Sequence, residues 1–375
     1  MRLALLTNMP SQHQSDLGAE LASILGQDNF RLVFAEPTSD ARQEMGWDDA
    51  FSEPYILRMW ESQAAQQEVQ QWIEQADVVV QGRFPMALVK NRIKAGKLTF
   101  AYQERFWKRP FNLFRLIARL PRIYQRYWSV NKPNYHLLAA GAYVASDLAK
   151  IGMFKNRAWK FGYFLPASKS QPAEKNNESL QLLWCARFAP VKRVQDAFQI
   201  VRELLKLGVD CQLTLIGDGE LRSQAEEWSA DITDQVEFLG WQPKNKVAEE
   251  MRKADIFLMT SGFGEGWGMV INEAQAAGCM VVANQDVGAA PWLIEHGKSG
   301  LLYQQAELAN VAKEIANLSR EHRVSMGQNG KKIHDQFWCV SVVAQRLVGL
   351  SRDLLFHSGK DIKTKHQDGP CAAAR

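Results

Sequence analysis

Residues 255–278 read DIFLMTSGFGEGWGMVINEAQAAG, and their pattern indicates the fold class. The apolar run at 255–260 predicts a buried strand, the glycine-rich run at 261–268 predicts a loop, and residues 268–277 have the composition of a helix. Glycines let backbone amides approach a ligand closely, and the N-terminus of the helix favours an anion. Glu265 lies in the loop, and Glu273 lies about two turns into the helix.

The same alternation of short apolar runs and amphipathic stretches continues along the chain, as is typical of an α/β protein with parallel sheets. The predicted strands are residues 2–7, 31–35, 77–81, 98–102, 136–139, 180–186, 212–216, 236–239, 255–260 and 280–283. The predicted helices include residues 62–75, 194–207, 221–230, 244–253 and 268–277.

The length of 375 residues suits two domains rather than one. We expect a first Rossmann-like domain at 1–167, a polar linker at 168–178 and a second Rossmann-like domain at 179–339. The helical pattern at 340–356 is expected to cross back to the first domain. The polar residues 357–375 are expected to form a flexible tail.

Charge is distributed unevenly between the parts of the chain. Residues 1–82 hold four basic and 13 acidic side chains, whereas residues 83–165 hold 17 basic and two acidic side chains, a net charge of +15. An imbalance of this size predicts a charged partner for the first domain.

Other features of the sequence favour a soluble, cytoplasmic protein. The longest run without Lys, Arg, Asp or Glu is residues 133–146, too short to span a bilayer. The N-terminus lacks the pattern of a signal peptide. The five cysteines form no C-x-x-C pair, which supports neither a disulfide framework nor a zinc site.

Cations follow the first predicted strand of the second domain. Arg187 and Lys192 come after residues 180–186, and Gly217-Asp218-Gly219 forms a tight turn after the next strand. Cations at the carboxyl end of a strand suit a diphosphate, which Arg can bind through two hydrogen bonds. Carboxylates such as Glu265 and Glu273 suit sugar and ribose hydroxyls, because they accept two hydrogen bonds from adjacent groups.

Taken in order, these motifs resemble those of glycosyltransferase family 4. The resemblance covers residues 180–340 and rests on Arg187…Lys192, Ile216-Gly217-Asp218-Gly219, Phe238-Leu239-Gly240, Ala254-Asp255, Glu265…Glu273 and Ala276-Ala277-Gly278. The family consists of retaining enzymes of the GT-B fold, in which two Rossmann-like domains face each other across a cleft. Bacterial capsule, O-antigen and exopolysaccharide glycosyltransferases are similar members.

The resemblance implies a role for each matched residue. Arg187 and Lys192 would bind the donor diphosphate, Glu265 the donor sugar as a catalytic group, and Glu273 the nucleotide ribose. The rest of the expected nucleotide-binding side consists of Gly217, Gly266, Trp267, Gly268 and Met269.

The resemblance also implies a hexosyltransferase-like reaction that retains the configuration of a UDP- or GDP-sugar. No metal or other cofactor is expected, since Arg187 and Lys192 would stabilise the charge that develops on the departing diphosphate. The sequence contains no Asp-x-Asp. The acceptor is expected to be a saccharide or a lipid-linked saccharide of cell-surface polysaccharide synthesis.

The first domain supplies the expected acceptor side. His13 follows the first strand, and Gln103 and Glu104 follow the strand at 98–102. Residues 105–128 hold seven basic side chains, no acidic one and many aromatic ones. That composition is typical of an interfacial membrane anchor.

Within this stretch we expect a helix at 112–120, bracketed by Pro110 and Pro121. Its Arg115 and Arg119, together with Arg122, are expected to contact an anionic membrane or the diphosphate of a lipid-linked acceptor. The protein would then be peripheral on the inner face of the cell membrane. No nucleic-acid partner is expected, since the chain has no recognisable binding module.

The sequence lacks motif residues that two other classes of protein require. A dinucleotide oxidoreductase needs G-x-G-x-x-G after its first strand, where this chain has none. A P-loop nucleotidase needs a glycine where Trp292 precedes Gly297-Lys298-Ser299. A sugar-nucleotide epimerase on the same scaffold and a catalytically inactive nucleotide-sugar-binding subunit remain as alternatives.

Overall fold

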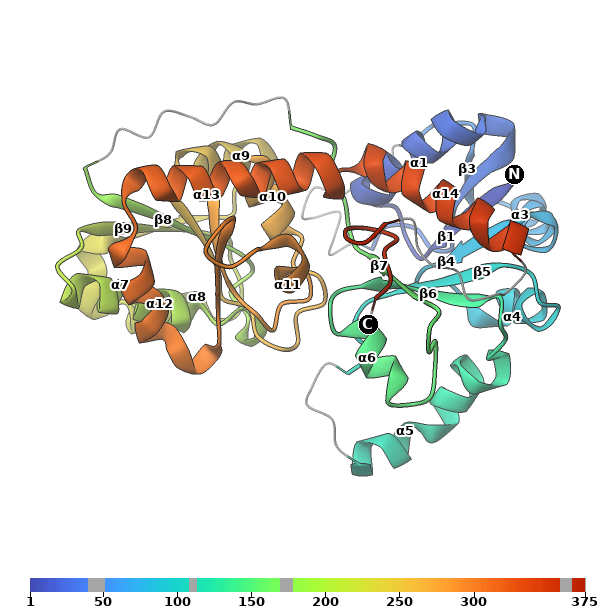
Figure 1. Cartoon of the computed structure of the whole chain (residues 1–375), viewed down its shortest axis with the longest axis horizontal. Helices are drawn as coiled ribbons and strands as arrows, with labels where there is room; N and C mark the ends of the chain where they lie inside the picture. Colours follow the sequence, from blue (N-terminus) through green and yellow to red (C-terminus); the bar gives the residue numbers. More distant parts are fainter. Residues whose placement is uncertain (40–50, 108–112, 169–177, 358–365, 375) are drawn as a thin grey trace. The chain divides into compact units, whose positions relative to one another are not determined.

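The computed structural model describes residues 1–39, 51–107, 113–168, 178–357 and 366–374 (Figure 1). The chain divides into two compact units, one made of Met1–Pro166 with Trp338–Arg375 and the other of Ala167–Phe337. Most of the predicted linker, residues 169–177, lies outside the described residues.

The first unit contains a seven-stranded parallel sheet in the order β3-β2-β1-β4-β5-β6-β7. Its strands are β1 (Leu3–Thr7), β2 (Phe30–Phe34), β3 (Ile56–Arg58), β4 (Val78–Gln81), β5 (Thr99–Gln103), β6 (Tyr135–Ala140) and β7 (Ala158–Phe161). Its helices include α1 (Gln12–Leu25), α3 (Gln63–Gln75), α4 (Met86–Lys94), α5 (Leu113–Arg126), α6 (Val144–Ala149) and α14 (Val340–His357). The central strands are buried on both faces, as a parallel sheet covered by helices requires.

The second unit contains a six-stranded parallel sheet in the order β10-β9-β8-β11-β12-β13. Its strands are β8 (Leu180–Cys185), β9 (Cys211–Ile216), β10 (Val236–Gly240), β11 (Ile256–Met259), β12 (Met280–Asn284) and β13 (Gly300–Tyr303). Its helices include α7 (Val194–Lys206), α8 (Arg222–Trp228), α9 (Lys244–Lys253), α10 (Val270–Ala276), α11 (Ala290–Leu293), α12 (Leu308–Asn317) and α13 (Arg320–Ile333).

Both sheets have the strand order of a doubly wound fold. In the first unit the order reverses between β1 and β4, and in the second between β8 and β11. In such folds ligands bind outside the carboxyl ends of the strands at this reversal. The predicted fold class, α/β with two Rossmann-like parallel-sheet domains, is confirmed.

Three strands were not predicted from the sequence: β3, β7 and β13. Each is three or four residues long and forms an edge strand of its sheet, so its pairing rather than its own pattern defines it. The helix α14 extends from a π-helical segment, His334–Trp338, and packs on α1 in the first unit (Figure 1).

The expectation of a flexible tail is wrong for residues 366–374. The Lys160 amide donates to the Ala372 carbonyl at 2.7 Å, and the Cys371 amide donates to the Lys160 carbonyl at 2.8 Å. Cys371 and Ala372 are buried, and Trp159 forms an antiparallel bridge with Ala373. This segment therefore adds to the edge of the sheet at β7, which leaves fewer unpaired backbone groups there.

The predicted bracket of the basic helix is also wrong at its C-terminal end. α5 continues through Pro121 to Arg126. Ile123 and Tyr127, beyond the proline, are fully buried in the first unit. Their burial outweighs the hydrogen bond that Pro121 cannot make within the helix.

Candidate functional site

In the second unit the sequence-predicted residues lie after the strands that flank the reversal of strand order. Arg187 and Lys192 follow β8, whereas Glu265 follows β11. Lys192 ends a single turn of 3₁₀ helix, Pro190–Lys192, and Arg193 then adopts a left-handed conformation with φ of 52° before α7 begins. This turn directs the chain back across the carboxyl edge of the sheet.

Lys192 and Glu265 form an ion pair, with 2.5 Å between Nζ and Oε2. The two side chains are 24% and 16% exposed, so they are accessible from solvent without being fully hydrated. Lys192 has three N–H donors, so it can hold Glu265 and still donate to an anion. The structure therefore brings together a cation and a carboxylate from two different loops.

Hydrogen bonds to Thr260 and Gly262 hold these loops against each other. The Thr260 hydroxyl donates to the Lys192 carbonyl at 2.7 Å and accepts from the Trp184 indole at 2.9 Å. The Gly262 amide donates to the Val191 carbonyl at 2.9 Å. The separation of Lys192 and Glu265 is thus set by buried backbone and indole contacts, which limit the movement of either loop.

Two glycines allow the β8 and β9 loops to touch. A Cβ atom on Gly217, where φ is 129°, would lie 2.0 Å from the Ala186 carbonyl oxygen. A Cβ atom on Gly219 would lie 2.6 Å from the Phe188 carbonyl oxygen and 3.0 Å from Arg187 Cγ. Arg187 is exposed and lies beside Gly219, so it extends over a surface that has no side chain to obstruct it.

Glu273 lies in the first turn of α10 and is half-buried. Burial raises the pKa of its carboxyl above the usual value, and the charge of Lys244 partly opposes that rise. Burial also raises the pKa of the Cys185 thiol to about 12, with Glu273 adding to the rise and Lys192 opposing it. Cys185, Glu273 and Lys192 therefore share one neighbourhood.

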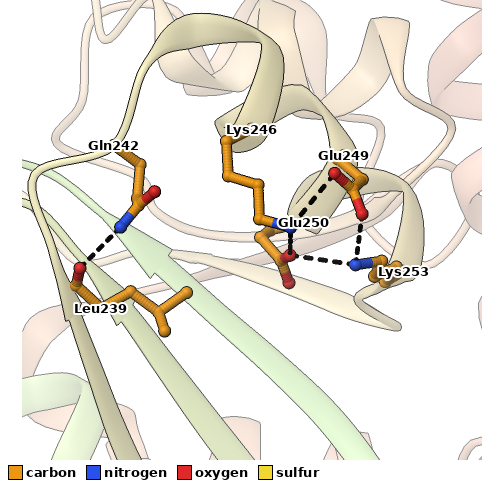
Figure 2. Close-up of polar contacts among 6 residues, drawn as sticks. All are labelled: Leu239, Gln242, Lys246, Glu249, Glu250 and Lys253. Atoms are coloured by element: carbon orange, nitrogen blue, oxygen red, sulfur yellow. Dashed lines mark hydrogen bonds and ion pairs between the residues drawn. The ribbon is translucent and has the colours of Figure 1, made fainter.

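Lys244 was not predicted from the sequence as a site residue. It is the first residue of α9, and the other two lysines of this helix are paired (Figure 2). Lys246 lies 3.1 Å from Glu249 and 3.3 Å from Glu250, and Lys253 lies 2.6 Å from Glu249. The signal that could have identified Lys244 is its position just after β10, in the same class of loop as Arg187.

The remaining predicted donor-side residues surround the start of α10. Gly268 has φ of 88°, and a Cβ atom there would lie 2.6 Å from Val287 Cγ1. The Trp267 side chain is buried and donates to Asn272 at 2.8 Å, so it packs within the unit. Gly266 is buried and Met269 is half-exposed, and they flank these two residues.

In the first unit, the three predicted acceptor-side residues are packed against aromatic rings or close to them. His13 lies 6.5 Å from the Tyr163 ring, and Gln103 accepts a hydrogen bond from the Tyr127 hydroxyl at 2.9 Å. The charge of Glu104 contributes to the raised pKa of the buried Tyr102 hydroxyl, after burial itself and Tyr163.

The basic stretch at 105–128 divides between core and surface. Arg105 is buried, with 3.1 Å between its Nε and Asp147 Oδ2, and the Trp107 indole donates to the Asp147 carbonyl. Arg119 lies 5.3 Å from the Trp107 ring, whereas Arg122 is exposed. The Arg115 side chain lies outside the described residues. In the described part of this stretch some basic and aromatic side chains are therefore buried, and the membrane contact of Arg119 and Arg122 stays a prediction.

Two searches of the described residues bear on other kinds of site. Among those residues, no helix is both long and apolar enough to cross a membrane. No group of three or more His, Cys, Asp or Glu side chains in the same part of the chain is placed to hold a metal ion.

Comparison with known proteins identifies the second unit. Residues 167–333 match the model of the family Glycosyl transferases group 1. The chain is 31% identical over 169 residues to N-acetyl-alpha-D-glucosaminyl L-malate synthase of Bacillus anthracis, covering 44% of this chain and 43% of that protein. It is 32% identical over 151 residues to the amylovoran biosynthesis glycosyltransferase AmsK of Erwinia amylovora, covering 38% and 37%. The chain thus spans less than half the length of these two relatives.

Solved structures extend the likeness to the fold of almost the whole chain. Anabaena HepE in complex with UDP superposes with a TM-score of 0.66 at 15% identity, covering 94% of this chain and all of that one, 100%. The lipopolysaccharide outer core galactosyltransferase WaaB superposes with the same TM-score, 0.66, at 16% identity and covers 96% of this chain. The chain thus has a GT-B fold, and its second unit is similar to the model of the family Glycosyl transferases group 1.

Proposed function

We propose that the protein is a glycosyltransferase that moves a sugar from a UDP- or GDP-sugar to a saccharide acceptor in cell-surface polysaccharide synthesis. The observation that carries the proposal is the Lys192–Glu265 pair at the reversal of strand order in the family-matched unit. The UDP bound in the HepE structure and the amylovoran biosynthesis named for AmsK are consistent with this assignment.

In the proposed reaction, the bond between the sugar C1 and the diphosphate oxygen breaks, and a bond from C1 to the acceptor oxygen forms on the same face. The acceptor proton passes to a phosphate oxygen of the departing diphosphate. Arg187 and Lys192 stabilise the negative charge that develops there, without a metal ion. Glu265 accepts hydrogen bonds from the sugar hydroxyls, and Glu273 from the ribose.

We further propose that the first unit binds an anionic membrane surface through α5. Phe114, Ile117 and Tyr124 are 82%, 55% and 60% exposed and recur at intervals of three or seven residues, so they share one side of the helix. Leu116, Leu120, Ile123 and Tyr127 occupy the side that packs inward. An exposed apolar stripe beside arginines is typical of a helix that lies in a membrane interface.

Isothermal calorimetry on the full chain tests the donor site. Glu273→Gln should weaken free nucleoside diphosphate and nucleotide-sugar alike, by about ten- to a hundredfold, because a charged hydrogen bond is lost. Glu265→Gln should leave the affinity for free nucleoside diphosphate unchanged and abolish turnover. Glu249→Gln, on the surface of α9, is the matched control and should change neither.

Unchanged nucleotide affinity in Glu273→Gln would contradict the ribose assignment. Release of free nucleoside diphosphate from the sugar donor distinguishes a transferase from an epimerase, which keeps the nucleotide attached. A wild-type chain that binds nucleotide-sugar but never releases the diphosphate with any acceptor would contradict the proposed transfer.

A further inference from the structure

The backbone carbonyl of Lys192 is held by a side chain from a distant part of the second unit. Its oxygen accepts a hydrogen bond of 2.7 Å from the Thr260 hydroxyl, which directly follows β11. The Lys192 amide donates to the Ala189 carbonyl at 2.9 Å, within its own turn. Both backbone polar groups of Lys192 are therefore bonded, and the bond to its carbonyl ties the turn to another strand.

The orientation of this carbonyl determines the backbone angles on either side of it. Its peptide unit joins Lys192 to Arg193, so it sets ψ of Lys192 and φ of Arg193. Arg193 has φ of 52°, in the left-handed region that residues with a Cβ atom seldom adopt. Such a conformation persists only where the surrounding contacts hold it. The hydrogen bond from Thr260 is one such contact, and it acts on the peptide unit itself.

The direction of the Thr260 hydroxyl is fixed by Trp184. The Trp184 indole donates to the same oxygen at 2.9 Å. An indole has a donor and no acceptor, and a hydroxyl has a single hydrogen, so that hydrogen is left for the Lys192 carbonyl. The Trp184 side chain is buried in β8, and its ring lies 4.9 Å from that of Phe188. Packing of the indole in the core therefore orients the hydroxyl.

A second set of hydrogen bonds connects the Glu265 loop to the same turn. The Gly262 amide donates to the Val191 carbonyl, and the Glu265 amide donates to the Gly262 carbonyl, each at 2.9 Å. The loop is therefore attached to the turn at two adjacent residues, through this bond and through that of Thr260. With both attachments in place, Lys192 Nζ lies 2.5 Å from Glu265 Oε2.

We propose that Trp184 and Thr260 are positioning residues of the donor site. The indole orients the hydroxyl, the hydroxyl holds the peptide unit that follows Lys192, and the Lys192 ammonium is thereby kept beside Glu265. The ammonium then meets the charge that develops on the departing diphosphate from a fixed position, which favours the transition state over the bound substrate. The effect on turnover rests on the proposed function, whereas the placement of Lys192 does not.

The placement of Lys192 is tested without a donor, by acetylating the full chain with limiting acetic anhydride and following each lysine by peptide mass spectrometry. Thr260→Val keeps the shape of the side chain and removes the hydroxyl. It should speed the modification of Lys192 by about fivefold, the effect of one lost hydrogen bond of typical strength. Thr260→Ser, which keeps the hydroxyl, should restore the wild-type rate. Lys253, which lies 2.6 Å from Glu249, is the internal reference and should not change.

Two further variants show whether the effect passes through these contacts. Trp184→Phe should also speed the modification of Lys192, and it carries the test alone if Thr260→Val does not fold. Combined with Thr260→Val it should add less than about twofold, because substitutions within one network are not additive. Thr99→Val is the matched control and should leave Lys192 unchanged. Thr99 is a buried threonine of the first unit that donates to a backbone carbonyl at 3.0 Å and accepts from Arg92 at 3.2 Å.

Hydrolysis of UDP-glucose or GDP-mannose, in which water takes the place of the acceptor, measures the effect on turnover. Thr260→Val should lower kcat by about tenfold or more and change KM by less than about twofold, because a misplaced cation is lost mainly to the transition state. Thr260→Ser should again resemble the wild type, and Thr99→Val should leave kcat unchanged.

A wild-type rate of Lys192 modification in both Thr260→Val and Trp184→Phe would overturn the positioning role. An equal change in Thr99→Val would do the same, since the effect would then come from general loss of stability. Faster modification of Lys192 with an unchanged kcat would also overturn it. A wild-type chain that shows the expected modification rates and no turnover of any nucleotide-sugar would instead contradict the proposed function, and the placement of Lys192 would stand.

Discussion

At the scale of the single residue, the expected role of Glu273 and its burial favour opposite ionisation states of its carboxyl. Its expected role needs a charged carboxylate that accepts hydrogen bonds, whereas its burial favours the neutral acid and raises its pKa. The charge of Lys244 opposes this effect only in part. Burial of the ionised side chain therefore costs stability in the second unit, and a ligand that donates hydrogen bonds to it would offset that cost.

The pH dependence of Glu273→Gln follows from this raised pKa. The folded-state pKa lies above the unfolded value, so the stabilising contribution of the protonated side chain is complete below the unfolded pKa. It is lost as pH rises through the folded pKa. Glu273→Gln imitates the neutral acid at every pH, so its melting temperature should match the wild type near pH 4 and exceed it near pH 7.5.

Thermal unfolding followed by circular dichroism across that pH range measures the difference. Glu249→Gln, an exposed member of the α9 ion pairs, controls for the loss of one negative charge. A Glu273→Gln variant less stable than the wild type at neutral pH would show that the carboxylate has a structural partner, and the argument from burial would fail.

At the scale of elements, the helix α5 both contributes side chains to the core and presents an apolar stripe to solvent. Its inward side holds Ile123 and Tyr127 in the core, while Phe114, Ile117 and Tyr124 face solvent. Exposed aromatic and aliphatic side chains in one stripe are uncommon on a monomer surface unless they meet a membrane or a partner.

Vesicle co-sedimentation tests the membrane role of α5. Binding should rise with anionic lipid content and fall with salt, because each basic residue near the surface contributes about 1 kcal/mol. Phe114→Ser, Ile117→Ser and Tyr124→Ser together should reduce binding to all vesicles, whereas Arg119→Glu with Arg122→Glu should reduce binding mainly to anionic ones. Leu355→Ser with Phe356→Ser removes exposed apolar surface from α14 and should have no effect. Equal binding by all three variants would exclude α5 as the anchor.

The docking of the C-terminal segment on β7 can be tested by comparing substitutions at two neighbouring alanines, one buried and one exposed. Ala372 is fully buried and its neighbour Ala373 is exposed, although both lie beside the same strand. Ala372→Asp should lower the free energy of unfolding by at least about 2 kcal/mol, because it buries a carboxyl without a partner. Ala373→Asp should change it by less than about 0.5 kcal/mol. Denaturant titrations that gave equal losses would show that the segment does not dock as the structure describes.

For the whole molecule, the central expectation is that protein cations replace a metal in catalysis. Arg187 and Lys192 both follow β8 at the carboxyl edge of the second sheet, so a donor diphosphate would meet two positive charges there. Turnover of the nucleotide-sugar should therefore survive excess EDTA, and Arg187→Ala should reduce turnover far more than Arg193→Ala. Arg193 is a suitable comparison because it is committed to Asp196 at 2.8 Å. Loss of activity in EDTA that magnesium or manganese restores would contradict the expectation.

The α/β class, the two-domain division and most strands of both sheets could be predicted from the sequence alone. These depend on local hydrophobic periodicity and on glycine-rich turns, which are properties of neighbouring residues. The motif spacing likewise selected Lys192 and Glu265 before their pairing was visible, since residues that follow adjacent parallel strands meet at one edge of a sheet.

Features that depend on residues far apart in the chain could not be predicted and are evident only in the folded structure. The edge segment at 366–374 is ordered by hydrogen bonds to β7, more than 200 residues earlier, and no local pattern encodes that pairing. In the sequence, Arg105 cannot be distinguished from the other arginines of residues 105–128. In the structure it is buried and forms an ion pair with Asp147. A cavity in the first unit is lined by Asn8, Gln81, Lys90 and Arg126, which come from separate elements. Its charge exists only because the strand order places those elements side by side.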